Sequence, residues 1–312
     1  MAKFDSEISI FSPAKINLHL AVKEKRPDGF HNLESVFLAL DWGDRLCVRG
    51  AAEDGLQIAV PSIKMSVPEG VTGEDLFITD NIIWRALALF REKTSFLQNF
   101  DIKLEKNIPI GGGLGGGSSN AASALLAFNQ IAGFPLKKDE LLEMGAALGS
   151  DVPFFLHNIN AAWVTGRGEY IKPLGTDILR SVPEMPKLYL VLVYPGFSSN
   201  TATAYRLLDE YRIFNPHENI KETIENACSF NVLSRPETWE FSNDFLNIFP
   251  ENEKSVYQEI IANLKESGAL FASLSGAGSV CFGVFENEEH ARKTVELFRG
   301  KWKIVQFCSS LG

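Results

Sequence analysis

Six of the seven residues from Gly111 to Gly117 are glycine, and this run constrains the fold more than any other part of the chain. Glycine is less favourable than alanine by about 0.5–1 kcal/mol in a regular element. Six glycines therefore cost on the order of 3–6 kcal/mol if the difference applies to each of them. A sequence that keeps such a run needs its backbone to approach something closely, without side chains in the way.

The segments on either side of the glycine run have clear local signals. The alternating stretch "FDIKLEKNIPI" predicts a strand that ends at Ile110. The stretch "SSNAASALLAFNQIAG" predicts a helix that is capped by Ser118 and Ser119 and ends at Gly133. A strand, a glycine loop and a helix start bring free backbone N–H groups and a positive dipole end to one place. This arrangement suits a polyphosphate, whereas a flexible linker is not usually flanked in this way.

Two common phosphate-binding patterns do not fit the run. The Walker-type loop requires G-x-x-x-x-G-K-[ST], but in the window that starts at Gly112 the lysine position is taken by Ser118. The dinucleotide pattern G-x-G-x-x-G fits the first six residues of the run, but it also requires an acidic residue at a strand end about 20 positions later. The nearest acidic residues, Asp139 and Glu140, lie in the helical pattern "KKDELLEM" instead.

Composition limits the kind of protein that the chain can form. It has 312 residues, of which 45% are hydrophobic, and a formal net charge of −9. A chain of about 300 residues buries roughly three quarters of its unfolded surface, which allows a large core and two domains. The acidic balance disfavours a nucleic-acid partner, because a broad footprint needs a basic face. The apolar run "LYLVLVY" is too short to span a membrane.

Cysteine usage indicates a reduced compartment. Cys47, Cys228, Cys281 and Cys308 are far apart and form no C-x-x-C pair, which favours the cytoplasm over a disulfide scaffold or a zinc site. The histidines show no H-E-x-x-H spacing, so we expect no metal held by protein ligands alone. The first residues, "MAKFDSEISIF", lack the pattern of a signal or transit peptide.

Periodicity predicts the remaining elements. In the first part we expect strands over 8–25, broken at Pro13, and over 33–50, with a turn over 26–33 between them and a helix over 81–90. The further elements are a helix over 137–149, a strand over 187–196, a mainly helical and loop-rich segment over 200–263, a strand–turn–strand over 269–285, a helix over 288–300 and a strand over 301–307. The second part predicts an α+β domain, with a boundary near residue 165.

Four separated blocks resemble the GHMP small-molecule kinases, in the order found in that family. They are "SPAKINLHL", the glycine run, "LGSDVPFF" and the late glycine turn "LSGAGS". The resemblance implies a two-domain α+β fold, with a ribosomal-protein-S5-like nucleotide-binding domain over 1–165 and a ferredoxin-like α+β substrate-binding domain over 166–312. It also implies a kinase that uses ATP and Mg²⁺ and phosphorylates the alcohol group of a small molecule.

The resemblance assigns the phosphates of ATP to the glycine run and its neighbours, with the serines facing the triphosphate and Mg²⁺. The cofactor-binding residues that it implies are Pro109, Ile110, Gly111, Gly112, Gly113, Leu114, Gly115, Gly116, Gly117, Ser118 and Ser119.

Beside this loop, Asp151 is the candidate catalytic base, since an aspartate within reach of an alcohol contributes roughly 10²–10⁴-fold. Taken alone, it would be a turn or cap residue between Gly149 and Pro153. Lys15 is expected to keep Asp151 ionised and to stabilise charge on the transferring phosphate, although most strand lysines are simply exposed. Asn17 lies on the same strand face and is expected to bind substrate or to orient the lysine.

The block "RPDGFH", from Arg26 to His31, resembles "RPDGYH" in the branch of the family that phosphorylates a cytidyl diphosphate of methylerythritol on the non-mevalonate route to isoprenoids. This implies that Phe30 stacks on cytosine, that His31 reads the edge of the base, and that Phe197 forms the opposite wall. Without the family, Phe30 would be assigned to a core and His31 to a surface turn. Phe30 replaces the usual tyrosine, Ser150 the common alanine, and "SGAG" the commoner "TGTG"; none of these changes removes a charged group.

Other functions stay open at the level of sequence. They are a homoserine or mevalonate kinase of the same family, a nucleotide-binding relative without catalysis, and a dinucleotide oxidoreductase. Lys15 and Asp151 disfavour the second, and the missing acidic residue disfavours the third. A small-molecule substrate, a monomer or homodimer, and no membrane or nucleic-acid partner complete the expectation.

Overall fold

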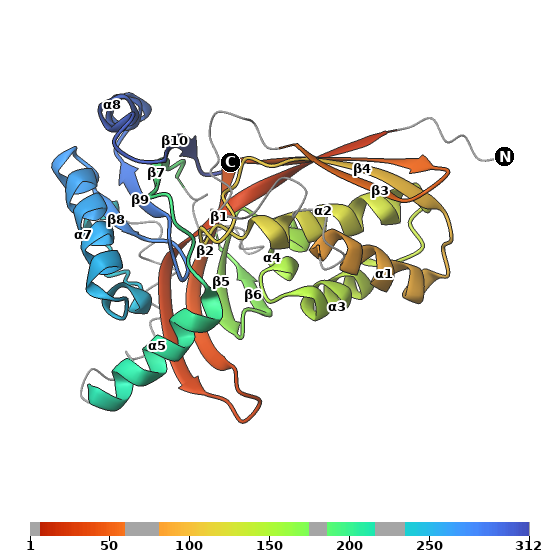
Figure 1. The fold of residues 1–312 in the computed structure, drawn as a ribbon, viewed down its shortest axis with the longest axis horizontal. Helices are drawn as coiled ribbons and strands as arrows, with labels where there is room; N and C mark the ends of the chain where they lie inside the picture. Colours follow the sequence, from red (N-terminus) through yellow and green to blue (C-terminus); the bar gives the residue numbers. More distant parts are fainter. Residues whose placement is uncertain (1–6, 60–80, 175–185, 216–234, 312) are drawn as a thin grey trace, which may run out of the picture. The chain divides into compact units, whose positions relative to one another are not determined.

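The computed structural model describes residues 7–59, 81–174, 186–215 and 235–311 (Figure 1). These residues form two compact units, and each unit is built from several segments. Unit 1 comprises the described residues within 1–14, 42–110 and 115–158, and unit 2 those within 15–41, 111–114 and 159–312. A single cut near residue 165 does not reproduce these units, because the long strands β1 and β2 contribute to both. The assignment of ATP binding to 1–165 and of substrate binding to 166–312 stays a prediction.

In unit 1, four helices lie against one face of a small sheet (Figure 1). The second half of β2 (His31–Ala51) pairs antiparallel with β4 (Asn99–Glu105), and β3 (Gly55–Ala59) pairs parallel with β4. The helices are α1 (Ile82–Thr94), α2 (Gly116–Ile131), α3 (Lys138–Leu148) and α4 (Val152–His157). Their core is aromatic: the ring of Phe128 lies 4.8 Å from that of Phe100 and 5.9 Å from that of Phe90. The helices expected around 81–90 and 137–149 are confirmed.

Strand β1 (Ile8–Lys25) runs through Pro13, so the break that was expected there is wrong. A Cβ placed on Gly43 of β2 would lie 2.3 Å from the carbonyl oxygen of Ser12 and 2.8 Å from the Cα of Pro13. Gly43, which has no side chain, therefore allows the backbones of β1 and β2 to approach closely at Ser12 and Pro13. Proline is tolerated in a strand where its missing N–H is not needed for pairing.

The strand expected to reach Ile110 ends at Glu105. The reason is Asp44, a fully buried carboxylate that accepts hydrogen bonds from the backbone N–H groups of Asn107 and Ile108 at 2.7 and 2.8 Å. These bonds take the backbone away from the sheet and start the loop before the glycine run. No local pattern marks this, because Asp44 lies more than sixty residues earlier in the chain.

Unit 2 contains the other half of the first sheet and a second, antiparallel sheet. β1 and the first half of β2 form a hairpin, and β2 pairs with β5 (Ala161–Gly166), which pairs with β6 (Tyr170–Pro173). The second sheet has the order β10–β7–β9–β8, with strands Ile304–Ser309, Tyr189–Tyr194, Cys281–Phe285 and Phe271–Leu274. These strands confirm the predicted ones.

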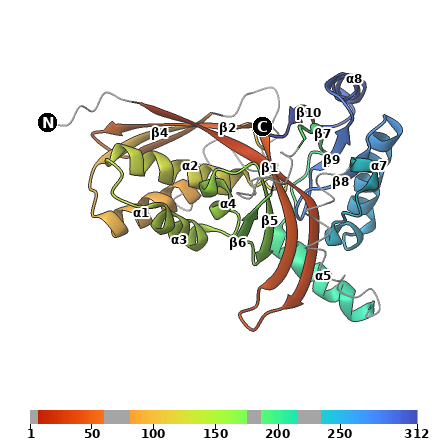
Figure 2. The ribbon, with the colours of Figure 1, turned by 180° about the vertical axis from the view of Figure 1, so that it is seen from behind.

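The helices of unit 2 are α5 (Thr201–Phe214), α7 (Glu251–Glu266) and α8 (Glu288–Phe298), with short 3₁₀ turns η2 (Pro236–Thr238) and η3 (Asp244–Asn247). Helix α5 crosses the strands of the β1–β2 hairpin in both views (Figures 1 and 2). The mainly helical character expected over 200–263 is confirmed where it is described, and residues 216–234 lie outside the described part. Within the described ranges, no helix combines the length and the apolar character needed to cross a membrane.

Candidate active site

The first half of the glycine loop is held in unit 2 by its carbonyl groups. The carbonyl oxygens of Gly111 and Gly112 accept hydrogen bonds from the backbone N–H groups of Ser199 and Val280, at 3.0 and 3.1 Å. The carbonyl oxygen of Gly113 accepts from the Oγ of Ser275, and that of Leu114 accepts from the backbone N–H of Lys15, both at 3.0 Å. These bonds join the loop to the "PAKIN" block and to the late glycine turn. Because the carbonyl oxygens are engaged, the amide N–H groups are what the loop can offer to a ligand.

Two glycines of the run are needed for different reasons. Gly113 has φ +77°, and a Cβ on it would lie 2.1 Å from the carbonyl oxygen of Ser275, so no other residue fits there. A Cβ on Gly117 would meet no atom within 4 Å. Gly113 therefore serves close contact within the protein, whereas Gly117 borders open space at the start of α2. The cost of the glycine run is offset partly by protein contacts and partly by an open approach.

Helix α2 begins earlier than expected, so the prediction that Ser118 and Ser119 cap it is wrong. Gly115, in the left-handed conformation at φ 68°, is the N-cap, and the helix makes no side-chain capping bond there. The backbone N–H of Ser119 donates to the carbonyl of Gly115 at 2.9 Å. The N–H groups of residues 116–118 in the first turn lack an intrahelical acceptor. Ser119 is fully buried, and its Oγ has no hydrogen-bond partner among the described residues.

A buried ionic network in unit 1 supports this helix start. The Asp44 carboxylate receives hydrogen bonds from the Lys106 ammonium and, at 2.9 Å, from the Asn120 amide, in addition to two backbone N–H groups. Burial lowers the pKa of Lys106, and the contact with Asp44 opposes this only in part. A Cβ on Gly116 would lie 2.9 Å from the Lys106 Nζ, so the ammonium lies directly against the first turn of α2. Sequence reasoning missed Asp44 and Lys106, because neither belongs to a motif.

Asp151 lies at the N-terminus of α4, where its side chain makes no capping bond to the helix. Asp151 is thus the N-cap and turn residue that its sequence context alone would indicate, without a capping hydrogen bond from its side chain, and its role as the catalytic base stays a prediction. A Cβ on Gly149 would lie 3.5 Å from Val152 Cγ2 and 3.9 Å from the Oγ of Ser118. Within unit 1, the turn that carries Asp151 is therefore next to the first turn of α2.

Lys15 and Asn17 are buried, and they point to the same side of β1 as predicted. The Lys15 Nζ donates to the Asn17 Oδ1 at 2.6 Å and lies 4.4 Å from the centre of the Phe37 ring. The Asn17 amide donates to the Oγ of Ser35 at 2.8 Å, and the backbone N–H of Asn17 donates to the Oγ of Ser275 at 3.4 Å. An exposed strand lysine is thereby excluded. That Lys15 keeps Asp151 ionised stays a prediction.

A turn is confirmed at the tip of the β1–β2 hairpin, but it covers residues 26–30 rather than 26–33, because β2 begins at His31. The backbone N–H of Arg26 donates to the carbonyl of Phe30 at 2.6 Å, and Gly29 has φ +86°. The Phe30 side chain is 52% exposed, with the guanidinium of Arg167 4.9 Å from its ring centre. Phe30 is therefore not a core residue, and its ring is available for stacking.

His31 is buried, in contrast to the surface position that its sequence context alone would indicate. Its Nε2 lies 2.7 Å from the Oδ1 of Asp209, and its ring stacks on Tyr205 at 5.2 Å.

Phe197 contacts the ring of Tyr257 at 5.7 Å, and its carbonyl oxygen accepts a hydrogen bond from Ser279. The described ring contacts do not join Phe197 to Phe30, and its role as an opposite wall stays a prediction.

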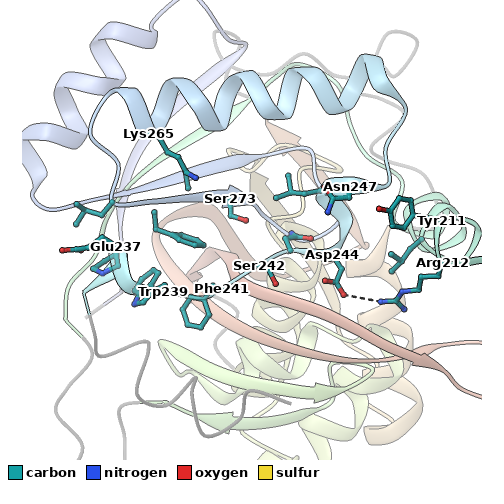
Figure 3. A pocket seen from close by; sticks show the side chains of 17 residues that line it. Tyr211, Arg212, Glu237, Trp239, Phe241, Ser242, Asp244, Asn247, Lys265 and Ser273 are labelled. Carbon is teal, nitrogen blue, oxygen red and sulfur yellow. Dashed lines mark hydrogen bonds and ion pairs between the residues drawn. The ribbon is translucent and has the colours of Figure 1, made fainter. Parts of the chain in front are cut away.

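No group of three or more His, Cys, Asp or Glu side chains that could hold a metal ion is found in the part of the chain that the structure describes. A cavity of about 720 Å³ is present in unit 2, lined by residues of α5, the 236–247 segment, α7 and β8 (Figure 3). An ion pair between Arg212 and Asp244, at 3.3 Å, lies at one end of it.

Comparisons with known proteins agree with the four motifs. The family models for the GHMP kinases N terminal domain and the GHMP kinases C terminal match residues 81–158 and 241–303. The 4-diphosphocytidyl-2-C-methyl-D-erythritol kinase of Syntrophomonas wolfei is 34% identical over 306 residues, covering 97% of this chain and 98% of that protein. The protein of the same name from Desulfitobacterium hafniense is 35% identical over 300 residues, covering 94% and 92%.

A solved structure gives the same result at the level of the fold. The crystal structure of 4-(cytidine 5'-diphospho)-2C-methyl-D-erythritol kinase superimposes with a TM-score of 0.76 at 29% identity and covers 98% of this chain and 100% of that one. The predicted two-domain α+β fold is confirmed. Since full-length relatives and both family models agree, the chain belongs to the GHMP kinases, a family of small-molecule kinases.

Proposed function

We propose that this chain transfers the γ-phosphoryl group of ATP to the 2-hydroxyl of 4-diphosphocytidyl-2-C-methyl-D-erythritol, a step of non-mevalonate isoprenoid precursor synthesis. The observation that carries the proposal is the hydrogen bonding that joins the "PAKIN" block, the glycine loop and the late glycine turn in unit 2. Relatives named for this activity that cover nearly the whole chain give independent support.

ATP is the phosphoryl donor, and its phosphates are bound by residues 109–119. The amide N–H groups of the loop and the first turn of α2 suit an anion, since both carry partial positive charge. The open space at Gly117 leaves room for a ligand there. Pro109 and Ile110, which directly precede the glycine run, are assigned to the same nucleotide site.

Mg²⁺ fits the residues present. The ion prefers oxygen ligands and is usually held by substrate phosphates with one or two protein groups and water. Ser119 offers a buried hydroxyl that has no other described partner, and Ser118 lies one position earlier. When bound, Mg²⁺ supplies neutralising charge to the phosphate oxygens.

Asp151 accepts the proton of the substrate hydroxyl. The hydroxyl oxygen forms a bond to the γ-phosphorus, the bond from that phosphorus to the bridging oxygen breaks, and ADP leaves with the electron pair. Lys15 stabilises negative charge on the transferring group, and Asn17 holds the lysine through the 2.6 Å hydrogen bond.

Phe30 and His31 bind the cytosine. The exposed ring of Phe30 supplies a face for stacking, and the buried His31 fixes the end of the turn. Phe197 is proposed as the second ring that stacks on the cytosine.

We also propose a cytoplasmic setting, which the free thiols of Cys47, Cys281 and Cys308 support. Cys228 lies outside the described residues.

An ADP-release assay tests the function. Purified protein with ATP and Mg²⁺ is given the cytidyl diphosphate of methylerythritol, homoserine or mevalonate in parallel. We expect ADP only with the cytidyl substrate. Turnover with another alcohol keeps the family and overturns the substrate, whereas no turnover with any of the three favours a relative without catalysis.

A further inference from the structure

Asp209 on α5 connects the two strands of the β1–β2 hairpin at the base of its turn. Its Oδ1 lies 2.7 Å from the Nε2 of His31, and its Oδ2 accepts a hydrogen bond from the Nζ of Lys25 at 2.7 Å. Lys25 is the last residue of β1, and His31 is the first residue of β2. One carboxylate therefore closes the base of the turn that carries Phe30.

The surroundings of Asp209 restrict the His31 ring. Tyr205 lies one helical turn before Asp209 on α5, so both side chains are on the same helix face. The Tyr205 ring stacks on His31 with an interplanar angle of 20° and makes an edge contact with Phe245 at 5.0 Å. The tyrosine thus fixes the plane of the imidazole, while the carboxylate fixes its rotation.

Helix α5 is itself anchored to β1 one turn further on. Arg212 donates to the carbonyl oxygens of Val22 and Lys23 at 2.6 and 3.2 Å and pairs with Asp244 (Figure 3). The backbone N–H of Val22 donates to the same Asp244 carboxylate at 2.9 Å. Because α5 is held to the strand at this point, Asp209 is a fixed reference for the hairpin base.

Lys25 donates to one oxygen of Asp209, and His31 donates to the other when its Nε2 carries a proton. The contact with Asp209 therefore selects the Nε2–H tautomer of a neutral His31 ring. Burial raises the pKa of Asp209, but the hydrogen bonds from Lys25 and His31 outweigh it, so that the pKa lies below its ordinary value. The carboxylate is therefore ionised at neutral pH and can accept from both donors at once.

We propose that Asp209 is a positioning residue for the recognition of the cytidine diphosphate, acting through His31 and the turn over 26–30. This inference rests on the function proposed above. An asparagine at this position has one acceptor and one donor group, so it cannot accept from both Lys25 and His31. Either Lys25 or His31 then loses its bond, or His31 changes tautomer, and in each case the turn loses the carboxylate that closes its base.

Steady-state kinetics test this with Asp209→Asn and, as the matched control, Glu210→Gln. Glu210 is the next residue on α5, and its side chain pairs with the exposed Arg206 at 2.6 Å. For Asp209→Asn we expect the KM for the cytidyl substrate to rise by at least about tenfold, while kcat and the KM for ATP stay within about twofold. The control is expected to match wild type, and the ¹⁵N shifts of His31 are expected to change only in Asp209→Asn.

Equal cytidyl KM values in wild type and Asp209→Asn overturn the inference, as does an equal loss for ATP and the cytidyl substrate. Asp209→Glu keeps the charge and both acceptors, and its KM is expected to lie between the two. Should Asp209→Asn not fold, a wild-type KM in Asp209→Glu overturns the inference and a raised one supports it. A wild-type protein that does not phosphorylate the cytidyl substrate overturns the proposed function itself, and this inference with it.

Discussion

The Oγ of Ser275 donates a hydrogen bond to the carbonyl oxygen of Gly113 at 3.0 Å, across 162 residues of sequence. The Oγ of Ser275 in turn accepts a hydrogen bond from the backbone N–H of Asn17 at 3.4 Å. One serine of the late glycine turn thus links the glycine loop to the block that contains Lys15. The loop is a contact surface for its own protein as well as a ligand site, and the two roles can be separated by mutation.

Gly113→Ala should destabilise the fold. The new Cβ would lie 2.1 Å from the Ser275 carbonyl oxygen, and φ +77° is unfavourable for alanine. Strain of about 1–3 kcal/mol from the backbone adds to a similar amount from overpacking. Urea unfolding of the variant should show a loss of about 2–6 kcal/mol, and a midpoint equal to that of wild type would contradict the structure of the loop.

Gly117→Ala should behave differently, because its Cβ meets no atom within 4 Å. In the helix, alanine gains up to about 1 kcal/mol over glycine, so stability should be unchanged or slightly higher. The methyl group would enter the space proposed for the phosphates, and the KM for ATP should rise about tenfold, equivalent to roughly 1.4 kcal/mol. An unchanged KM for ATP would place the phosphates elsewhere.

Asp151→Ala should lower kcat by at least about a hundredfold while leaving the melting temperature near that of wild type. The side chain makes no capping bond to α4, so its loss should leave this helix folded. Ser150→Ala, one residue earlier, is the matched control and should keep wild-type turnover. Near-normal turnover of Asp151→Ala would remove this residue from the mechanism.

Asp44→Asn should destabilise unit 1 by about 3–5 kcal/mol, because it leaves the buried Lys106 ammonium without its counter-charge. Asp101→Asn is the control on the same sheet, since Asp101 pairs with the half-exposed Arg49 and should cost no more than about 1 kcal/mol. Urea unfolding of both variants measures the difference. Equal losses in the two variants would refute the role assigned to the Asp44 network.

The lowered pKa of Asp54 leads us to expect that its contribution to stability depends on pH. Burial raises the pKa of this carboxyl, but the hydrogen bonds from Arg91 and from the backbone N–H of Phe100 outweigh it, and the pKa lies below the ordinary value of 3.8. The stabilisation is therefore complete above about pH 5 and is lost as the pH falls through the ordinary value and then through the lowered one. The difference in unfolding free energy between wild type and Asp54→Asn should be constant from about pH 7 to pH 5 and should shrink below about pH 4. A difference that grows on acidification would contradict the sign.

The sequence by itself determined the family and supplied the candidate site residues. The glycine run, the "PAKIN" block and "RPDGFH" are local patterns, and each marks a backbone or side-chain requirement that short-range sequence can express. For the same reason it predicted the turn at Gly29, the helices α1, α3 and α8, and the strands of the second sheet, all of which depend on periodicity, caps and turn residues.

The tertiary structure alone decided where these patterns end and what holds them. The strand stops at Glu105 because Asp44 accepts from the N–H groups of Asn107 and Ile108, and α2 starts at Gly116 because Gly115 adopts a left-handed conformation. His31 is buried because α5 brings Asp209 to it across 178 residues. Hydrogen-bond partners this distant leave no periodic trace in the chain, since their meeting depends on the folded path of the backbone and not on their neighbours in sequence.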